Sequence, residues 1–303
     1  MPKIVYRRVD RRKPESTYLK KYARNVMSQG GEDGIVEQLL KVLGSHAESK
    51  WCVEFGAWDG KHYSNTWNLI NHHGYNAVMI EGSRTRFQDL LATYGAAPQV
   101  VCVNRIVSFA QGPDSLDSIF AETRLPRVFD LISIDIDGND YHVWDSLKSY
   151  APRIVVIEFN STIPNDVVFV QDMNFKVNQG CSLLALIELG QTKGYELAYV
   201  THLNAIFVRA DEFSKLGIAD NGIDAMYMPF IEPKMFQAFD GTLFNVGMDR
   251  LQWTLKKTKV KSTQFQLLPA AKRWFPGSIT DIQEREASGA PVPVAVPPKT
   301  PTR

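Results

Sequence analysis

The sequence has few cysteines, almost no net charge and no long apolar run. Three cysteines in 303 residues (Cys52, Cys102 and Cys181) are too few, and odd in number, for a disulfide framework, which favours a reducing compartment. No stretch approaches the roughly 18 consecutive apolar residues of a transmembrane helix. The basic first 21 residues contain no apolar segment of the kind that a secretory signal peptide requires. We therefore expect a cytoplasmic protein without a membrane span.

Apolar residues make up 44% of the chain and charged residues 22%, which suffices for a sizeable core and excludes a collagenous or wholly disordered protein. The net charge of +1 conceals an uneven distribution. Residues 1–24 hold nine Lys and Arg against two acids, and residues 251–280 hold six Lys and Arg and no acid. The N-terminal arm could meet a polyanion such as nucleic acid. A solvated arm, or one that docks on its own body, is the simpler interpretation, and we favour it.

Short apolar runs alternate with amphipathic segments through the middle of the chain. The runs resemble buried parallel strands and cover 51–55, 77–81, 100–104, 130–135 and 153–159. Helices are expected over 64–73, 83–94, 115–123, 141–150 and near 180–193, with another that ends at Gly44. Two further runs within 195–209 indicate a hairpin and therefore an antiparallel final strand. The pattern predicts an α/β fold with a Rossmann-like, doubly wound, mostly parallel seven-stranded sheet, plus an N-terminal helix and a C-terminal appendage.

Composition also suggests how the chain is divided. We expect a basic arm over 1–27, a cofactor-binding domain over 28–210 and a C-terminal appendage over 211–285 that contributes to substrate binding or packing. The last segment, 286–303, is rich in proline and is predicted to be disordered or polyproline-like. The substrate pocket is expected to be built from 160–180 and 211–280, where the sequence shows no clear pattern.

The loop after the first predicted strand is the first candidate site, because ligands of open α/β sheets bind beyond the carboxyl ends of the strands. It contains Gly56 and Gly60, which allow close approach to a ligand, together with the acids Glu54 and Asp59. Glu81 ends the second strand, where a carboxylate can accept hydrogen bonds from a ribose diol. A dinucleotide would need the spacing G-x-G-x-x-G and would be repelled by two acids. A nucleotide cofactor that carries positive charge suits this loop better, although an ordinary strand–turn–helix connection remains an alternative.

Carboxylates also follow the fourth and fifth strands. Asp135, Glu158 and Asn160 offer hard oxygen ligands for Mg²⁺ or another divalent cation, with water and substrate hydroxyls completing the shell. The alternative is that Asp135 or Glu158 only accepts hydrogen bonds from loop amides. The sequence leaves both interpretations open.

Five blocks of sequence together resemble one protein family. They are GEDGI (31–35), VEFGAWDGKHYSNT (53–66), MIEG (79–82), ISIDIDGNDY (132–141) and VVIEFNSTIP (155–164). In this order they resemble the FkbM-like branch of class I S-adenosylmethionine-dependent methyltransferases, over roughly residues 28–210. The resemblance implies a methyltransferase that acts on hydroxyl groups of sugars, glycans or secondary metabolites.

By the same resemblance, the residues near the methionine end of the cofactor are Gln29, Glu54, Gly56, Ala57, Asp59 and Gly60. Glu81 with Gly82 would bind the ribose, Asn104 would approach the adenine, and Asp135 would lie near the reacting methyl group. The sequence departs from the family pattern at Trp58, which replaces the middle glycine of the loop. Either the loop is wider here, or Trp58 turns into the core.

A hydroxyl acceptor needs a base, a metal ion or both. His142 lies just after the fourth strand and is the preferred candidate base, with His62 as a second candidate, although a lone histidine is more often structural. Glu32 could contact the cofactor, whereas Asp33 is expected to cap the first long helix. Tyr141 and Trp144 could form an aromatic wall for the acceptor, and core packing explains them equally well.

Two other functions remain open. The basic segments suggest a nucleic-acid methyltransferase, but the fourth strand lacks the [N/D]-P-P-[Y/F] turn used on exocyclic base amines, and the basic stretch around 256–261 has few aromatic residues for base stacking. The other alternative is a non-catalytic module that keeps the cofactor fold. Asp135, Glu158 and His142 argue against such a loss of function. The oligomeric state is not readable from the sequence.

Overall fold

The computed structural model describes residues 3–44, 50–247, 250–251, 256–258, 260–273, 283–284 and 287–289. The chain forms two compact units. The larger unit comprises Val9–Phe230, and the smaller combines Met1–Arg8 with Ile231–Arg303. Every residue that the sequence singles out for cofactor binding, metal binding or catalysis lies in the larger unit, whereas most of the segment 211–280 expected to bind substrate lies in the smaller one.

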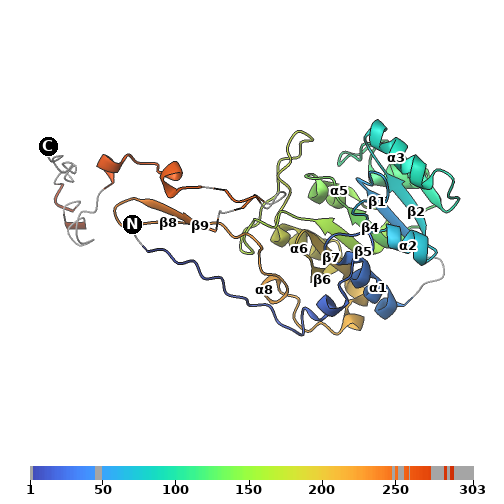
Figure 1. The fold of residues 1–303 in the computed structure, drawn as a ribbon, viewed down its shortest axis with the longest axis horizontal. Coiled ribbons are helices and arrows are strands. Elements are labelled where there is room, and N and C mark those ends of the chain that lie inside the picture. The colour runs from blue at the N-terminus through green and yellow to red at the C-terminus, as the bar shows by residue number, and fades with distance from the viewer. Residues whose placement is uncertain are drawn as a thin grey trace. The chain divides into compact units, whose positions relative to one another are not determined.

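The larger unit contains a seven-stranded sheet in the order β3-β2-β1-β4-β5-β7-β6 (Figure 1). All its pairings are parallel except those of β7, which is antiparallel to both β5 and β6. The strands are β1 Trp51–Phe55, β2 Asn76–Ile80, β3 Val100–Val103, β4 Val128–Ile134, β5 Ala151–Glu158, β6 Tyr195–Val200 and β7 Asn204–Arg209. The predicted mostly parallel, Rossmann-like sheet with an antiparallel final strand is confirmed.

Six helices connect and cover the sheet. They are α1 Glu32–Leu43, α2 Trp67–His72, α3 Arg84–Tyr94, α4 Leu116–Ala121, α5 Asp140–Ser146 and α6 Leu183–Thr192. Shorter elements of this unit are the 3₁₀ helices η1 Tyr18–Tyr22 and η2 Ser214–Leu216 and the single-turn helices α7 Ala210–Phe213 and α8 Ile223–Met226. The helices therefore occur where hydrophobic periodicity predicts them, and the differences are confined to their ends.

Two of these ends have clear causes. The segment before α2 does not join the helix, because Ser64 and Thr66 donate their hydroxyl hydrogens to Glu54 instead. Helix α5 ends before residue 148, since the backbone amides of Lys148 and Ser149 donate hydrogen bonds to the Asp117 carboxylate at 3.0 and 2.9 Å. Local side-chain acceptors thus compete with helix continuation at both places.

The sheet is buried on both faces, which explains why its strands are continuously apolar. One face packs against residues of α4, α5 and α6, and its core includes Phe55, Phe120, Trp144 and Phe207. The other packs against residues of α1, α2 and α3, with Leu39, Leu69 and Leu90 among its core side chains. Cys52 and Cys181 lie buried in these cores as free thiols.

Residues 9–24 of the basic arm belong to the larger unit and pack against the rest of it. Lys13 and Arg11 form ion pairs with Asp220 and Asp224 at 2.6 and 3.2 Å, and the Lys13 amide donates to the Ala225 carbonyl at 2.8 Å. Leu19, in η1, is completely buried. For these residues, the structure agrees with an arm that docks on its own body.

The smaller unit contains a hairpin that the sequence did not reveal. Strand β8 Lys234–Gln237 pairs antiparallel with β9 Leu243–Val246. Across these two strands the rings of Phe236 and Phe244 stack, with their centroids 5.4 Å apart. Two 3₁₀ helices follow, η3 Ser262–Phe265 and η4 Ala270–Lys272. Lys259, within the basic stretch, and all of the predicted proline-rich tail except 287–289 lie outside the described residues. In the described part of the chain, no helix has the length and apolar character needed to cross a membrane.

Candidate active site

The acids singled out by the sequence gather at the carboxyl edge of the sheet, because parallel strands end on the same side. Glu54 is on β1 next to its last residue, and Glu81 and Asp135 immediately follow β2 and β4. Glu158 is the last residue of β5. Residues far apart in sequence therefore share one edge of one sheet.

Gly56 brings the loop after β1 against the end of β4. Its φ of +73° lies in the left-handed region, and a Cβ atom added there would lie 1.9 Å from the carbonyl oxygen of Asp135. Gly60 has φ +68°, and its Cβ would lie 2.6 Å from the ring of Tyr94. Only glycine fits at these two positions without movement of the surroundings.

Trp58 adopts a positive φ of 43° and is 39% exposed, so it does not turn into the core as one of our two interpretations proposed. Its indole lies beside the guanidinium of Arg86, whose Cζ is 5.0 Å from the ring centroid, and beside His62 at 5.2 Å. The cation–π and edge contacts hold the ring at the surface of the loop.

Glu54 is buried and accepts three hydrogen bonds from the segment that leads into α2. The hydroxyls of Ser64 and Thr66 donate to one carboxylate oxygen at 2.5 and 2.6 Å, and the Asn65 amide donates to the other at 2.9 Å. The next two amides, of Thr66 and Trp67, donate to the Ser64 hydroxyl. Burial raises the pKa of Glu54, and these donors partly oppose the effect. The hydrogen-bond donors at the start of α2 therefore already have acceptors within the protein.

Glu81 connects two loops at the edge of the sheet. Its carboxylate accepts hydrogen bonds from the amides of Trp58 at 2.8 Å and Ser83 at 2.6 Å. The side-chain amide of Asn104 donates to the Glu81 carbonyl at 2.7 Å and reaches the Gly82 carbonyl at 3.5 Å. Glu81, Gly82 and Asn104, all predicted to bind the nucleoside part of a cofactor, therefore lie together.

Ala57 and Asp59 shape the loop itself. The Ala57 amide donates to the carbonyl of Ile80 at 3.1 Å, and the Asp59 carboxylate accepts from the amides of Lys61 and His62 at 2.9 and 2.7 Å. These bonds hold the turn in one conformation.

The segment before α1 also reaches this edge. Glu32 is fully buried and accepts hydrogen bonds from the Gly30 amide at 2.7 Å and the side-chain amide of Asn204 at 3.0 Å, whereas Gln29 is exposed. Asp33 was expected to cap α1, but the N-cap is Gly31 with φ +94°. Asp33 lies inside the first turn and accepts from the backbone amides of residues 26–28 instead.

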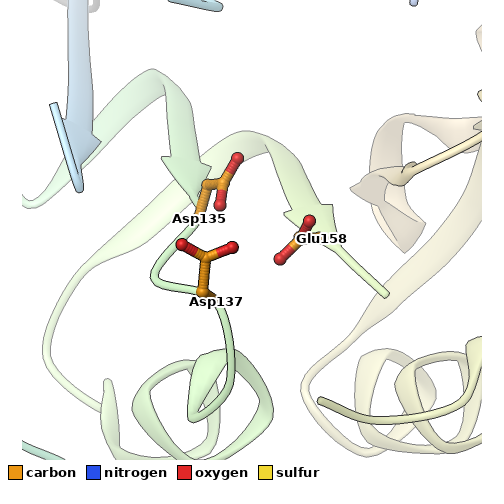
Figure 2. Close-up of side chains that lie close together, drawn as sticks. All are labelled: Asp135, Asp137 and Glu158. Carbon is orange, nitrogen blue, oxygen red and sulfur yellow. The ribbon is translucent and has the colours of Figure 1, made fainter. Parts of the chain in front are cut away.

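Asp135, Asp137 and Glu158 form a cluster in which one oxygen of each lies within 4.8 Å of the others (Figure 2). Burial and the neighbouring carboxylates raise the pKa of Asp135 to about 8. Burial, and then the charge of Asp135, raises the pKa of Glu158 well above its ordinary value. The protein alone therefore does not stabilise the fully ionised cluster.

Asp140 shapes the turn that carries Asp137. Its two carboxylate oxygens accept hydrogen bonds from the amides of Ile136 and Gly138, both at 2.8 Å, while Asp137 between them has φ +57°. Burial raises the pKa of Asp140 to about 6, although these amides oppose the shift. The turn thereby directs Asp137 back toward the strand ends, and sequence reasoning did not select this residue. Its signal was the spacing of three aspartates at 135, 137 and 140.

Asn160, the third predicted metal ligand, has its side chain engaged elsewhere. Its carbonyl oxygen accepts hydrogen bonds from the amide and the hydroxyl of Thr162, at 3.1 and 2.7 Å, and its amide donates to the Gln179 carbonyl at 3.0 Å. The structure thus brings Asp135 and Glu158 together with Asp137 rather than with Asn160.

His142, the preferred candidate base, lies in the first turn of α5. Its Nε2 is 2.8 Å from the carbonyl oxygen of Gln171, which can only accept, so Nε2 carries the hydrogen and Nδ1 is the basic nitrogen. The ring of His62 lies 4.0 Å, centroid to centroid, from that of Tyr63 in the exposed loop after β1, with the two planes tilted by 43°.

Gln171 also organises the loop that follows β5. Its side-chain oxygen accepts from the amides of Gln179 and Gly180, both at 2.8 Å, and its amide donates to the Val177 carbonyl at 2.8 Å. This loop carries Phe175, which is 51% exposed and stacks on Phe109 at 4.7 Å.

The aromatic side chains divide between surface and core. Phe109 contacts the His142 ring edge-on at 6.0 Å. Trp144, considered for an acceptor wall, is completely buried in the core, and Tyr141 is half-buried. The aromatic neighbours of His142 are therefore the half-buried Phe109 and Tyr141, and the exposed Phe175 stacks on Phe109.

No protein-family model matches this sequence, and no curated protein matches it either. Among solved structures, the chain is similar to the CMeT domain of the citrinin polyketide synthase, at 13% identity and a TM-score of 0.41, over 59% of this chain and 51% of that one. It is also similar to the SAH-bound N-terminal domain of EvdMO1, at 13% identity and a TM-score of 0.38, over 61% of this chain and 82% of that one. A third similar structure is M. jannaschii TYW2 in complex with AdoMet, at 16% identity and a TM-score of 0.34, over 62% of this chain and 80% of that one.

The chain spans about half the length of the citrinin synthase domain that it matches. At identities of 13–16%, these similarities concern the fold alone.

Proposed function

We propose that this protein is an S-adenosylmethionine-dependent O-methyltransferase that acts on a hydroxyl group of a saccharide, glycan or other polyhydroxylated small molecule. The observation that carries the cofactor assignment is the position of Glu54. Its carboxylate takes the donors at the start of α2 that a pyrophosphate would need in a dinucleotide site. A second negative group there would be repelled, whereas a cofactor with a sulfonium and an ammonium group is attracted.

Glu81 and Asn104 are the proposed nucleoside contacts. Each carboxylate oxygen of Glu81 accepts one backbone hydrogen bond and keeps a further lone pair for a ribose hydroxyl. Because both loops donate to this carboxylate, it is held in position before any ligand arrives. Gln29, Glu54, Gly56, Ala57, Asp59, Gly60 and Gly82 complete the proposed cofactor site.

The hydroxyl acceptor is proposed from the FkbM-like resemblance of the sequence blocks. When bound, S-adenosylmethionine supplies a methyl carbon activated by its sulfonium. The protein must then align the acceptor and remove its proton. We assign the base to Nδ1 of His142, whose ring is held through Nε2 by the Gln171 carbonyl. Asp135 is proposed to lie beside the reacting groups at the end of β4.

A nucleic-acid substrate is less well supported. Within the larger unit, Arg11, Lys13 and Arg24 of the basic arm are paired with Asp224, Asp220 and Glu37. These cations already have acidic partners, which weakens their pull on phosphates. Tight RNA binding with a steep salt dependence would revive this alternative, and turnover would separate an enzyme from a non-catalytic binding module.

Calorimetry on the full chain tests the cofactor. We expect binding of S-adenosylmethionine and S-adenosylhomocysteine but not of NADH. Glu81→Gln should weaken S-adenosylhomocysteine binding by about tenfold to a hundredfold, as expected for lost hydrogen bonds to a charged group. Glu188→Gln, an exposed site on α6, is the matched control. Tritium from labelled S-adenosylmethionine should then appear in a glycan fraction. If neither S-adenosylmethionine nor S-adenosylhomocysteine binds, or if NADH binds, the proposal is refuted.

A further inference from the structure

We propose that Asp135, Asp137 and Glu158 form a binding site for a hard divalent cation, a class that includes Mg²⁺, Mn²⁺ and Ca²⁺. One carboxylate oxygen from each residue lies within 4.8 Å of the others. Oxygen ligands on opposite sides of such an ion are about 4–5 Å apart, because each lies about 2.0–2.6 Å from it. The three side chains therefore need little rearrangement to share one ion.

Glu158 provides the second, independent observation. It is a buried side chain with 9% exposure, and no residue in the described part of the chain donates a hydrogen bond to it or pairs with it. Figure 2 shows its carboxylate directed toward Asp137. A largely buried carboxylate that receives no hydrogen bond from the described residues is costly, so its position indicates a positive ligand.

The other buried acids in the described residues differ from Glu158 in this respect. Each accepts at least one hydrogen bond from an amide, a hydroxyl or a guanidinium, and they are Glu32, Asp33, Glu54, Glu81, Asp130, Asp140 and Glu212. The protein thus satisfies its buried carboxylates as a rule. Glu158 is the exception among the described residues, and it lies where the carboxylates of Asp135 and Asp137 also converge.

The surrounding elements explain why three ligands can converge. Asp135 and Glu158 end two adjacent strands, paired parallel from Val128↔Ala151 to Ile134↔Ile157. Asp140 then bends the chain by accepting from the amides of Ile136 and Gly138, which places Asp137 between the strand ends. Three carboxylates leave coordination positions of a six-coordinate ion open to water and to acceptor oxygens.

The role of the ion in catalysis rests on the proposed function, whereas binding of the ion does not. A divalent ion lowers the pKa of a hydroxyl that coordinates it, which would assist a base such as His142. An acceptor with two adjacent oxygens, such as a vicinal diol, could occupy two open positions. The cation site therefore favours a polyhydroxylated acceptor over one with a single isolated hydroxyl.

The test is a titration of the EDTA-treated, dialysed full chain with Mn²⁺, followed by electron paramagnetic resonance of the free ion. We expect one bound Mn²⁺ per chain, displaced by Mg²⁺ or Ca²⁺. Asp137→Asn and Glu158→Gln should each weaken binding by at least about tenfold, since ligand charge sets the affinity. Asp172→Asn, an exposed acid on the loop after β5, removes the same charge and should bind Mn²⁺ as the unaltered chain does.

Thermal unfolding keeps the test independent of folding defects. In EDTA, Glu158→Gln should unfold at a temperature no lower than that of the unaltered chain, because it removes a buried carboxyl group that receives no hydrogen bond from the described residues. Mn²⁺ should raise the unfolding temperature of the unaltered chain but not that of this variant. The absence of stoichiometric binding of any of the three ions, or unchanged Mn²⁺ affinity in Glu158→Gln, would overturn the proposal.

Calorimetry with S-adenosylhomocysteine in EDTA separates this proposal from the proposed function. Cofactor binding without any ion binding would refute the cation site alone. Ion binding without cofactor binding would refute the methyltransferase assignment alone.

Discussion

Glu158, the last residue of β5, lies opposite Asn204, the first residue of β7, and the side-chain amide of Asn204 donates a hydrogen bond to Glu32 at the start of α1. The antiparallel strand therefore links two buried acids that are far apart in the sequence. Because β7 runs against the other strands, its first residue rather than its last reaches the carboxyl edge of the sheet. The topology of the last hairpin thus helps to build the candidate site.

Gly56→Ala should lower the free energy of unfolding by more than about 2 kcal/mol, because the added Cβ meets the backbone oxygen of Asp135 at 1.9 Å and cannot avoid it by side-chain rotation. Gly74→Ala is the matched control, since Gly74 has a similar φ of +68° with nothing within 4 Å of its Cβ position. It should cost only about 1 kcal/mol. Urea unfolding of both variants measures the difference, and equal losses would contradict this account.

Glu54→Gln should destabilise the chain by about 1–3 kcal/mol, because a carboxamide offers one good acceptor oxygen for three buried donors. Chemical denaturation monitored by tryptophan fluorescence provides the measurement. Glu188→Gln, an exposed change of the same kind, should leave stability within about 0.5 kcal/mol. If both variants unfold alike, Glu54 does not organise the start of α2.

Stability should fall in acid partly because of Glu212. Hydrogen bonds from Arg153 hold the pKa of this carboxylate at about 2, below its ordinary value of 4.5. A carboxyl group with a lowered pKa stabilises the fold above its ordinary pKa, and this contribution is lost as pH falls from 4.5 toward 2. Denaturation at a series of pH values should therefore show a decline that Glu212→Gln reduces.

Arg153 itself is 1% exposed and pairs with Asp130 as well as Glu212. Arg153→Met should cost about 3–5 kcal/mol at neutral pH, because it leaves the buried Asp130 without its cation and leaves Glu212 paired with Lys215 alone. A variant as stable as the unaltered chain would show that this ion pair contributes little to the fold.

His142→Gln tests the proposed base. Glutamine can still donate a hydrogen bond toward the Gln171 carbonyl, but it lacks the basic Nδ1. We expect kcat for methyl transfer to fall by about 10²–10⁴-fold, with the affinity for S-adenosylhomocysteine unchanged. His62→Gln, in the exposed loop after β1, serves as the comparison. An unchanged kcat in His142→Gln would assign His142 to holding the loop after β5.

Periodicity and residue type were enough to predict the fold. The apolar runs 51–55, 77–81 and 130–135 became strands to within a few residues, and the two runs predicted within 195–209 became the β6–β7 hairpin. These signals are local, because a strand buried on both faces must be apolar along its whole length. The smaller unit shows the limit of such signals, since its β8–β9 hairpin has exposed or half-exposed residues throughout and leaves no burial pattern to detect.

The candidate site was only partly accessible to the same reasoning. That acids lie at or just beyond the carboxyl ends of β1, β2, β4 and β5 is visible in the sequence, and the parallel strands place them on one edge. Which side-chain oxygens remain available is not visible, since the Asn160 side-chain carbonyl accepts hydrogen bonds from Thr162. The turn held by Asp140 also brings the exposed Asp137 close to Asp135 and Glu158. Side-chain hydrogen bonds within loops depend on backbone conformations that no periodic pattern encodes.

The order of apolar and polar residues by itself determined the strands, the helices and the edge of the sheet at which acidic side chains would accumulate. Only the tertiary structure decided which of those acids are satisfied by the protein, as Glu54 is, and which receive no hydrogen bond from the described residues, as Glu158 does not. The physical reason is that secondary structure follows from local burial. The satisfaction of a buried charge depends instead on atoms that distant segments bring within about 3 Å.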